Sequence, residues 1–130
     1  MADYFETITV EPADLNADWF EETDLGVLEE AGFEREEHGG CYYFYAPEGF
    51  YPNDEDETES KCAAVFQSVI ERSGGQLDEV VLMGATSCSK YRPGAFSGFV
   101  FRITANNVEV GTISDVLERM RARTWHHVQL

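Results

Sequence analysis

The chain has 130 residues and a formal net charge of −16, which comes from 25 acidic and 9 basic side chains. Because 43% of the residues are apolar or aromatic, the chain can bury a core, and the composition argues against disorder. The negative charge argues against direct binding of nucleic acids or acidic membranes, since phosphate recognition requires a basic footprint.

The N-terminal segment predicts one strand followed by two short helices. Aromatic and β-branched residues over 4–10 favour the strand. Pro12 suits the first turn of a helix whose apolar side would include Leu15. Thr23–Asp24 would cap the second helix, which would end at Gly32.

A β-hairpin and a long helix are predicted next. The hairpin would pair 33–37 with 41–46 around Gly39–Gly40, because glycine supplies the positive φ that a tight turn requires. After a loop, an acidic run over 54–59 leads into an amphipathic helix. The apolar stripe of this helix consists of Cys62, Val65, Phe66, Val69 and Ile70.

The second half of the chain predicts three more strands and a final helix. The strands cover 77–85, 96–104 and 108–110. Thr112 and Asp115 resemble a capping box that would open the helix. Its apolar stripe consists of Ile113, Val116, Leu117 and Met120.

The order of these elements indicates the fold class. Strands are grouped in hairpins with helices between them, and there is neither βαβ alternation nor a glycine-rich phosphate loop. We therefore expect an α+β fold in a single domain over residues 1–130. Its sheet should be mostly antiparallel with about five strands, and the helices should pack on one face.

The charge is distributed unevenly along the chain. Residues 1–60 contain 19 acidic side chains and one basic one, Arg35, whereas residues 61–130 contain 6 acidic and 8 basic ones. Concentrating charge in this way costs self-repulsion, and one use for it is to steer association with a basic partner. The sequence therefore predicts a non-enzymatic acidic binding or inhibitor protein that engages the basic surface of a nucleic-acid-binding protein.

The candidate contact residues combine carboxylates with aromatic anchors, a combination typical of protein–protein interfaces. The carboxylates come from the acidic run and from the hairpin, and the aromatic side chains come from residues 42–51. The set is Asp54, Glu55, Asp56, Glu57, Glu59, Glu34, Glu36, Glu37, Tyr42, Tyr45 and Tyr51. Alternate residues of a strand face opposite ways, so either Tyr42 with Phe44, or Cys41 with Tyr43 and Tyr45, faces away from the helices.

In size and charge the chain resembles the small acidic proteins that phages and plasmids encode against restriction or CRISPR systems. It is similar in the same respects to the immunity partners of basic nuclease toxins. This resemblance implies a role as a nucleic-acid mimic in counter-defence or immunity, with a protein rather than a nucleic acid as the partner.

Two other hypotheses stay open. Cys88 lies among polar and basic residues, an environment that lowers the pKa of a thiol, so a small enzyme with a Cys88- or carboxylate-based site is one alternative. The other is a halophile-type structural or oligomerisation domain whose acidity only confers solubility.

The sequence predicts no cofactor, no metal site and no membrane span. Asp54 and Asp56 resemble the start of a calcium loop, but loop positions 6 and 12 are Glu59 and Val65 instead of glycine and glutamate. The adjacent His126–His127 are poorly placed to bind one ion together. The three cysteines form no CxxC pair and no signal peptide is apparent, so we expect a cytoplasmic protein with reduced thiols.

Overall fold

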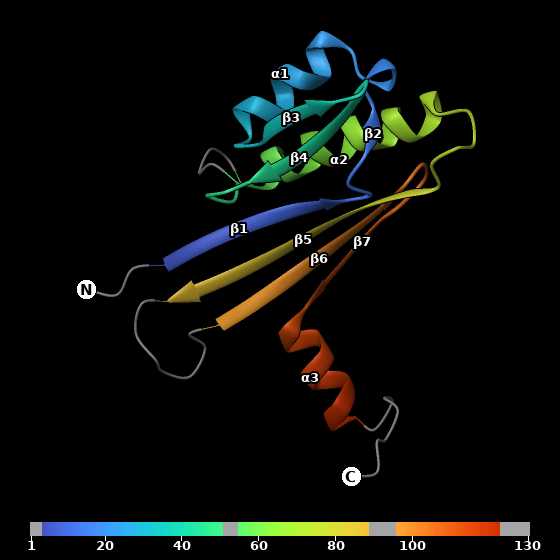
Figure 1. Cartoon of the computed structure of the whole chain (residues 1–130). Coiled ribbons are helices and arrows are strands. Elements are labelled where there is room, and N and C mark those ends of the chain that lie inside the picture. Colours follow the sequence, from blue (N-terminus) through green and yellow to red (C-terminus); the bar gives the residue numbers. More distant parts are fainter. Residues whose placement is uncertain (1–3, 51–54, 89–95, 123–130) are drawn as a thin grey trace.

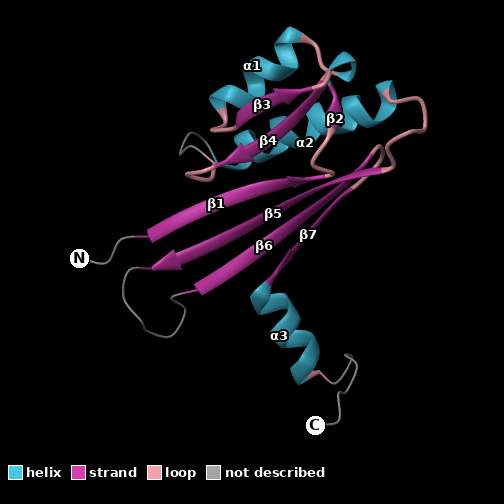
Figure 2. Ribbon diagram, in the orientation of Figure 1, coloured by secondary structure: helices cyan, strands magenta, loops and turns pink. Residues whose placement is uncertain are grey.

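The computed structural model describes residues 4–50, 55–88 and 96–122, which form one antiparallel sheet with helices packed against it (Figures 1 and 2). The strands are β1 (Tyr4–Glu11), β2 (Leu15–Asn16), β3 (Glu34–His38), β4 (Cys41–Ala46), β5 (Glu79–Cys88), β6 (Phe96–Thr104) and β7 (Val108–Thr112). The helices are α1 (Glu22–Glu30), α2 (Glu55–Arg72) and α3 (Ile113–Arg121). The α+β prediction is confirmed, with a sheet of seven strands rather than about five.

Strand β4 is the branching point of the sheet. One of its edges pairs with β3, and the other pairs first with β2 and then with β1. From β1 the sheet continues through β5 and β6 to β7, and every pairing is antiparallel. The β3–β4 hairpin turns at Gly39 and Gly40 with φ of 57° and 80°, the left-handed conformation for which the two glycines were expected.

The register of the strands divides the sheet into two faces. Helices α1 and α2 cover the face that we call the helix face, which carries Ile8, Phe44 and Leu82 among its buried side chains. Side chains at the alternate positions, such as Tyr45 and Met83, point to the opposite face, which we call the open face.

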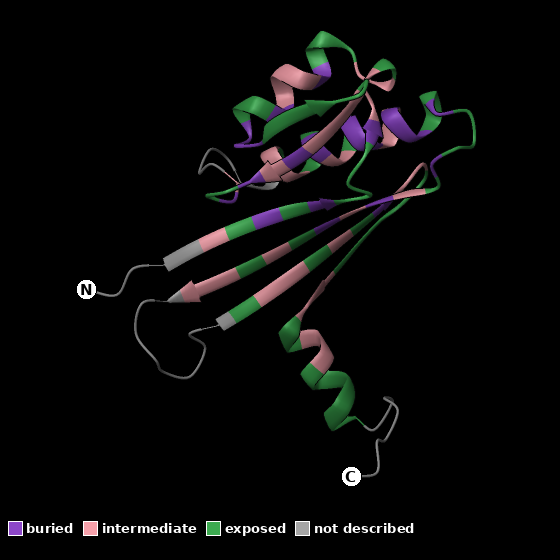
Figure 3. Ribbon diagram, viewed as in Figure 1, coloured by how far each residue is buried: buried purple, intermediate pink, exposed green. Residues whose placement is uncertain are grey.

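The core lies between the helix face and the two helices (Figure 3). The apolar stripe predicted for α2 is buried there as expected, and Leu28 of α1 joins it. Aromatic edges fill the interior, since the Phe66 ring lies 6.4 Å from that of Phe33 and 6.3 Å from that of Phe44. Strand β4 is thereby fixed against α2.

The first predicted helix is wrong. The chain after Pro12 instead forms the short strand β2 and one turn of 3-10 helix over Ala17–Trp19. Leu15 is fully buried and lies opposite Tyr42 in the sheet, which an isolated helix would not allow. Asn16 caps the turn by accepting a hydrogen bond at Oδ1 from the Asp18 N–H, 2.9 Å away, and such local bonds compete with α-helix.

Helix α3 departs from the rest of the fold. Its N-terminal capping box is formed as predicted, with Thr112 Oγ1 accepting from the Asp115 N–H and Asp115 Oδ2 accepting from the Thr112 N–H. The helix then runs away from the sheet, and most of it is exposed (Figure 3). None of its residues is buried.

Candidate functional site

The β3–β4 hairpin carries a cross-strand patch on the open face, which we call the tyrosine–glutamate patch. It consists of Glu34, Glu36, Tyr43 and Tyr45. Glu34 pairs directly with Tyr45, and Glu36 pairs directly with Tyr43. Directly opposed residues of an antiparallel pair have Cβ atoms about 4.5–5.5 Å apart, so each carboxylate lies beside a phenol ring. Both glutamates are exposed, whereas both tyrosines are half-buried.

The two rings of the patch form a small aromatic platform. The ring centroids of Tyr43 and Tyr45 lie 5.6 Å apart with an interplanar angle of 31°. Partial desolvation, together with the charges of Glu34 and Glu36, raises the pKa of Tyr45 above its ordinary value of 10.0. Negative charge is therefore concentrated beside an uncharged aromatic surface.

Further carboxylates lie on the other side of the hairpin from the patch. Helix α1, which packs on the helix face, carries exposed acidic side chains, and β3 adds Glu37 on the same face. Arg35 is the one basic side chain of β3, and its guanidinium bonds Glu29 of α1 at 2.7 Å. We call these carboxylates together with the patch the acidic surface, which lies on both sides of the β3–β4 hairpin. It comprises Glu22, Glu29, Glu30, Glu34, Glu36, Glu37, Tyr43 and Tyr45.

Tyr42 does not belong to this surface, although it was one of the expected aromatic anchors. It points to the helix face, where its ring lies 5.7 Å from that of Phe20 and 5.8 Å from that of Phe44. The Arg35 guanidinium carbon lies 5.3 Å from its ring centroid. The strand therefore separates Tyr42 from Tyr45 and brings Tyr43 to the patch in its place.

The acidic run, whose carboxylates are further candidate contacts, lies at the start of α2 as the sequence predicted. Glu55 and Asp56 belong to the first turn of that helix, and Glu57 forms an ion pair with Lys61 at 3.0 Å. Glu59 is half-buried. Asp54 and Tyr51 lie outside the described residues. The acidic run thus begins the helix, where carboxylates also stabilise the positive end of the helix dipole.

A shallow apolar groove lies beside α2 on the helix face. It has a volume of about 300 Å³ and is lined by Phe50, Phe101, Ile103 and Val110, with Glu59 among its polar residues. Among the described residues no three His, Cys, Asp or Glu side chains are placed to hold a metal ion. The groove therefore presents a carboxylate on an apolar wall.

The cysteines do not form a reactive centre among the residues whose side chains are described. Burial, with a contribution from the charge of Glu59, raises the pKa of the Cys62 thiol to about 12. Cys62 is completely buried in the core, and Cys41 is half-buried on the open face. The side chain of Cys88 lies outside the described residues, so the hypothesis of a Cys88 site stays untested.

Comparisons with known proteins identify no relative of the chain. Searches against protein-family models, curated proteins and solved structures found no match to the chain. Within the described part of the chain, no helix combines the length and the apolar character needed to cross a bilayer. The arrangement of side chains is therefore the basis for a functional proposal.

Proposed function

We propose that the protein is a cytoplasmic, non-enzymatic binding protein whose acidic surface engages a basic partner protein. The observation that carries the proposal is the tyrosine–glutamate patch, in which two phenol rings 5.6 Å apart are each paired with an exposed carboxylate. The carboxylates of α1 and Glu37, on the other side of the same hairpin, add to a negative field that attracts cations over longer distances.

The patch suits arginine and lysine side chains of a partner. Such a side chain packs its aliphatic stem on a tyrosine ring while its charged head pairs with the adjacent glutamate. Aromatic anchors beside desolvated charge pairs are the groups that supply most binding energy at interfaces. The same negative charge repels nucleic acids. A partner protein that binds nucleic acids would therefore bind the acidic surface at the basic site where it otherwise binds DNA or RNA.

The proposal can be tested with a defined cationic probe before any partner is identified. Binding of an arginine-rich peptide to the whole chain would be followed by NMR or calorimetry at low and high salt. The affinity should fall steeply as salt increases, because the association depends on screened charges. Glu34→Gln with Glu36→Gln should abolish most of this binding, and so should Tyr43→Ala with Tyr45→Ala.

A matched control separates the patch from total charge. Glu71→Gln with Asp78→Asn removes the same two charges from exposed positions outside the acidic surface. This control should bind the probe nearly as well as the wild type. Equal losses in the control and in the glutamate variant would show that the acidity acts only through net charge, which is the solubility hypothesis, and would reject the proposed site.

A further inference from the structure

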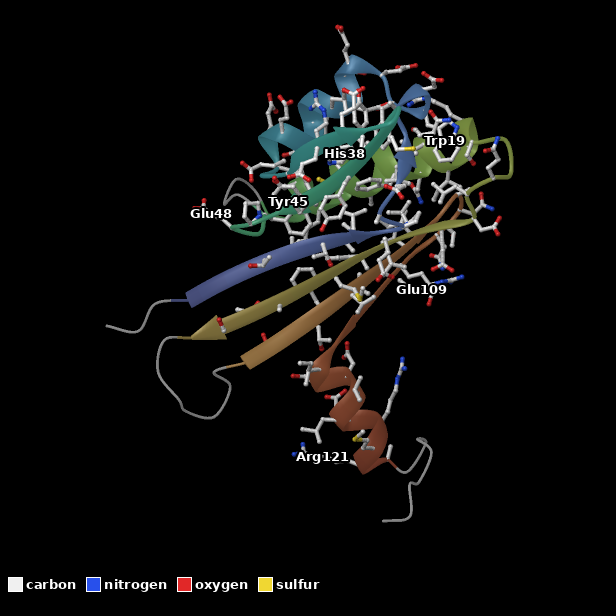
Figure 4. All side chains as sticks on the ribbon, in the orientation of Figure 1. Trp19, His38, Tyr45, Glu48, Glu109 and Arg121 are labelled. Atoms are coloured by element: carbon white, nitrogen blue, oxygen red, sulfur yellow. The ribbon has the colours of Figure 1, made fainter. Side chains whose placement is uncertain are left out.

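Strand β3 lies at one edge of the sheet, and Figure 4 marks its hairpin with His38 at the turn and Tyr45 on the neighbouring strand. Among the described residues β3 pairs only with β4, so its other backbone edge has no strand beside it. All five residues of β3 are exposed, including Arg35 and Glu37 on the helix face, so α1 does not cover this edge. A free strand edge binds an extended segment of another chain through backbone hydrogen bonds. The edge therefore favours an extended segment as its occupant.

The turn of the hairpin determines which backbone groups face the free edge. His38 and Cys41 flank the two-residue turn and lie directly opposite each other. Residues that flank such a turn exchange hydrogen bonds, and hydrogen-bonded pairs alternate with non-hydrogen-bonded pairs along an antiparallel ladder. Counted back from the turn, Arg35 and Glu37 fall in the non-hydrogen-bonded pairs, so their N–H and C=O groups face outward. These are the groups that an added strand would engage.

The side chains of β3 specify the charges of that strand. Its three glutamates, Glu34, Glu36 and Glu37, favour arginine or lysine directly opposite each of them, because opposite charges in direct cross-strand pairs are stabilising. Arg35 disfavours a basic residue opposite itself, since like charges in such pairs are destabilising. All described strand pairings of the sheet are antiparallel. Read from its N-terminus, an antiparallel strand then needs two adjacent basic residues, one non-basic residue and a third basic residue.

The neighbours of these glutamates leave this preference intact. Arg35 bonds Glu29 at 2.7 Å on the helix face. His38 Nε2 lies 3.5 Å from Glu36 Oε2, but the two side chains are 74% and 55% exposed, so an arginine can displace this contact. A second copy of β3 centred on Glu36 would pair Arg35 with Glu37, but it would also oppose Glu36 to itself and bring two acidic surfaces together. Charge complementarity therefore favours a basic segment of another protein.

We propose that the basic partner supplies an extended segment that joins the sheet as an antiparallel strand beside β3, with basic residues opposite Glu34, Glu36 and Glu37. This inference rests on the proposed function, from which it takes the basic character of the partner, and it adds the mode of recognition. Main-chain hydrogen bonds to Arg35 and Glu37 hold the segment whatever its sequence, and the paired charges determine which segments fit. The order of the basic residues therefore matters as well as their number.

The first experiment compares two short capped peptides of identical composition by NMR titration of the full chain. One has Arg-Arg-Thr-Arg between threonines, and the other has the reversed order Arg-Thr-Arg-Arg. The first should bind about 3-fold more tightly, because an antiparallel strand of reversed order places arginine opposite fewer of the glutamates. On binding, amide hydrogen exchange should slow at Arg35 and Glu37 but not at Glu36, whose N–H faces β4.

A second experiment removes single hydrogen bonds from the peptide without changing its charge. N-methylation of the threonine between the arginines, which lies opposite Arg35, removes an N–H that faces β3. It should weaken binding by about 10-fold. N-methylation of the arginine that follows is the matched control, because this residue lies opposite Glu34 and its N–H points away from β3. The control should bind like the unmodified peptide.

A third experiment blocks the edge of the protein itself. Arg35→Pro removes an outward N–H and places the proline ring on the free edge, a position that edge strands tolerate. Arg35→Ala makes the same change in charge and keeps the N–H. The proline variant should bind the Arg-Arg-Thr-Arg peptide about 10-fold more weakly than the alanine variant, although both are more acidic than the wild type. Slow exchange of the Glu36 amide in both variants would verify that the hairpin is formed.

The inference is overturned if N-methylation of the threonine leaves binding unchanged, if the reversed peptide binds as tightly as the first, or if the bound peptide does not slow exchange at Arg35 and Glu37. If the arginine-rich peptide still binds through Glu34 and Glu36 in those cases, the proposed function stands and only strand addition fails. If no arginine peptide binds, the proposed function fails as well. Dimerisation of the chain alone that Arg35→Pro abolishes would show that a second copy occupies the edge, and it would also overturn the inference.

Discussion

The contact between Asp24 and Arg72 joins α1 to α2, and its contribution to stability can be predicted. Arg72, at the end of α2, donates from Nη1 to Asp24 Oδ2 at 2.5 Å and to the Trp19 carbonyl at 3.0 Å. The same Asp24 oxygen accepts the Glu21 N–H at 2.9 Å, so it also caps α1. The Asp24 side chain is only 11% exposed. Replacing Arg72 by methionine keeps the aliphatic stem and removes the charge.

The expected cost follows from the bonds that are lost. A hydrogen bond to a charged group contributes about 1.5–3 kcal/mol, and the 33% exposure of the Arg72 side chain places the value toward the lower end. We expect Arg72→Met to lower the free energy of unfolding by about 2 kcal/mol, or Tm by roughly 6–10 °C for a chain of this length. Adding Asp24→Asn should cost less than the sum of the single changes, because the two side chains interact.

The assay is urea unfolding followed by far-UV circular dichroism, with Arg102→Met as the control. Arg102 also bridges two carboxylates, Glu79 at 3.2 Å and Glu109 at 3.1 Å, but its side chain is 47% exposed. Exposed pairs contribute at most about 1 kcal/mol, so the control should cost less than Arg72→Met. The reasoning is refuted if the two variants are equally stable, or if Arg72→Met unfolds like the wild type.

Three further predictions use single sites. Alkylation of the native protein at pH 8 should modify Cys41 and spare Cys62, because a pKa of about 12 keeps the buried Cys62 protonated. Rapid labelling of both cysteines would contradict the burial of Cys62. A Cβ at Gly84 would overlap the ring of Phe99, whereas a Cβ at Gly111 would meet open space. Gly84→Ala should therefore destabilise the fold by about 1–3 kcal/mol and Gly111→Ala should not, as thermal melts would show. Because the pKa of Tyr45 in the folded protein lies above its ordinary value of 10.0, this phenol stabilises the folded state at pH values below 10.0. That contribution is lost as the pH rises through the pKa of the folded state. Neutralising the two glutamates beside it should lower this pKa in a phenolate absorbance titration, and an unchanged pKa would contradict the patch.

Sequence patterns predicted those elements that carry a strong local signal. The stripe of α2 and the glycine turn of the β3–β4 hairpin are formed as expected, because helical periodicity and positive φ are properties of short segments. The segment after Pro12 was misassigned because pairing between Leu15 and Tyr42 decides its structure. Such pairing joins residues far apart in the chain, and local propensity does not report it.

The positions of the candidate contact residues also depend on packing that the sequence does not report. Alternation along β4 showed that Tyr43 and Tyr45 share a face, but only the packing of α2 on Phe44 determines which face stays open. Tyr42 was expected at the surface and lies against Phe20 instead. The acidic run begins α2 as the sequence predicted, and carboxylates at the start of a helix also stabilise the helix, so their charge alone does not identify a contact surface.

Strand β3 has a consequence for how the protein stays dispersed. In the described structure it pairs only with β4, so its outer backbone edge offers unpaired N–H and C=O groups. An edge of this kind templates strand addition and fibrillar aggregation unless charged side chains discourage it. Every residue of Glu34–His38 is exposed, and the strand consists of three glutamates, one arginine and one histidine. The carboxylates of β3 therefore oppose aggregation at this edge, in addition to their proposed role in binding. Replacing them with apolar residues would favour the pairing of β3 with strands of other molecules.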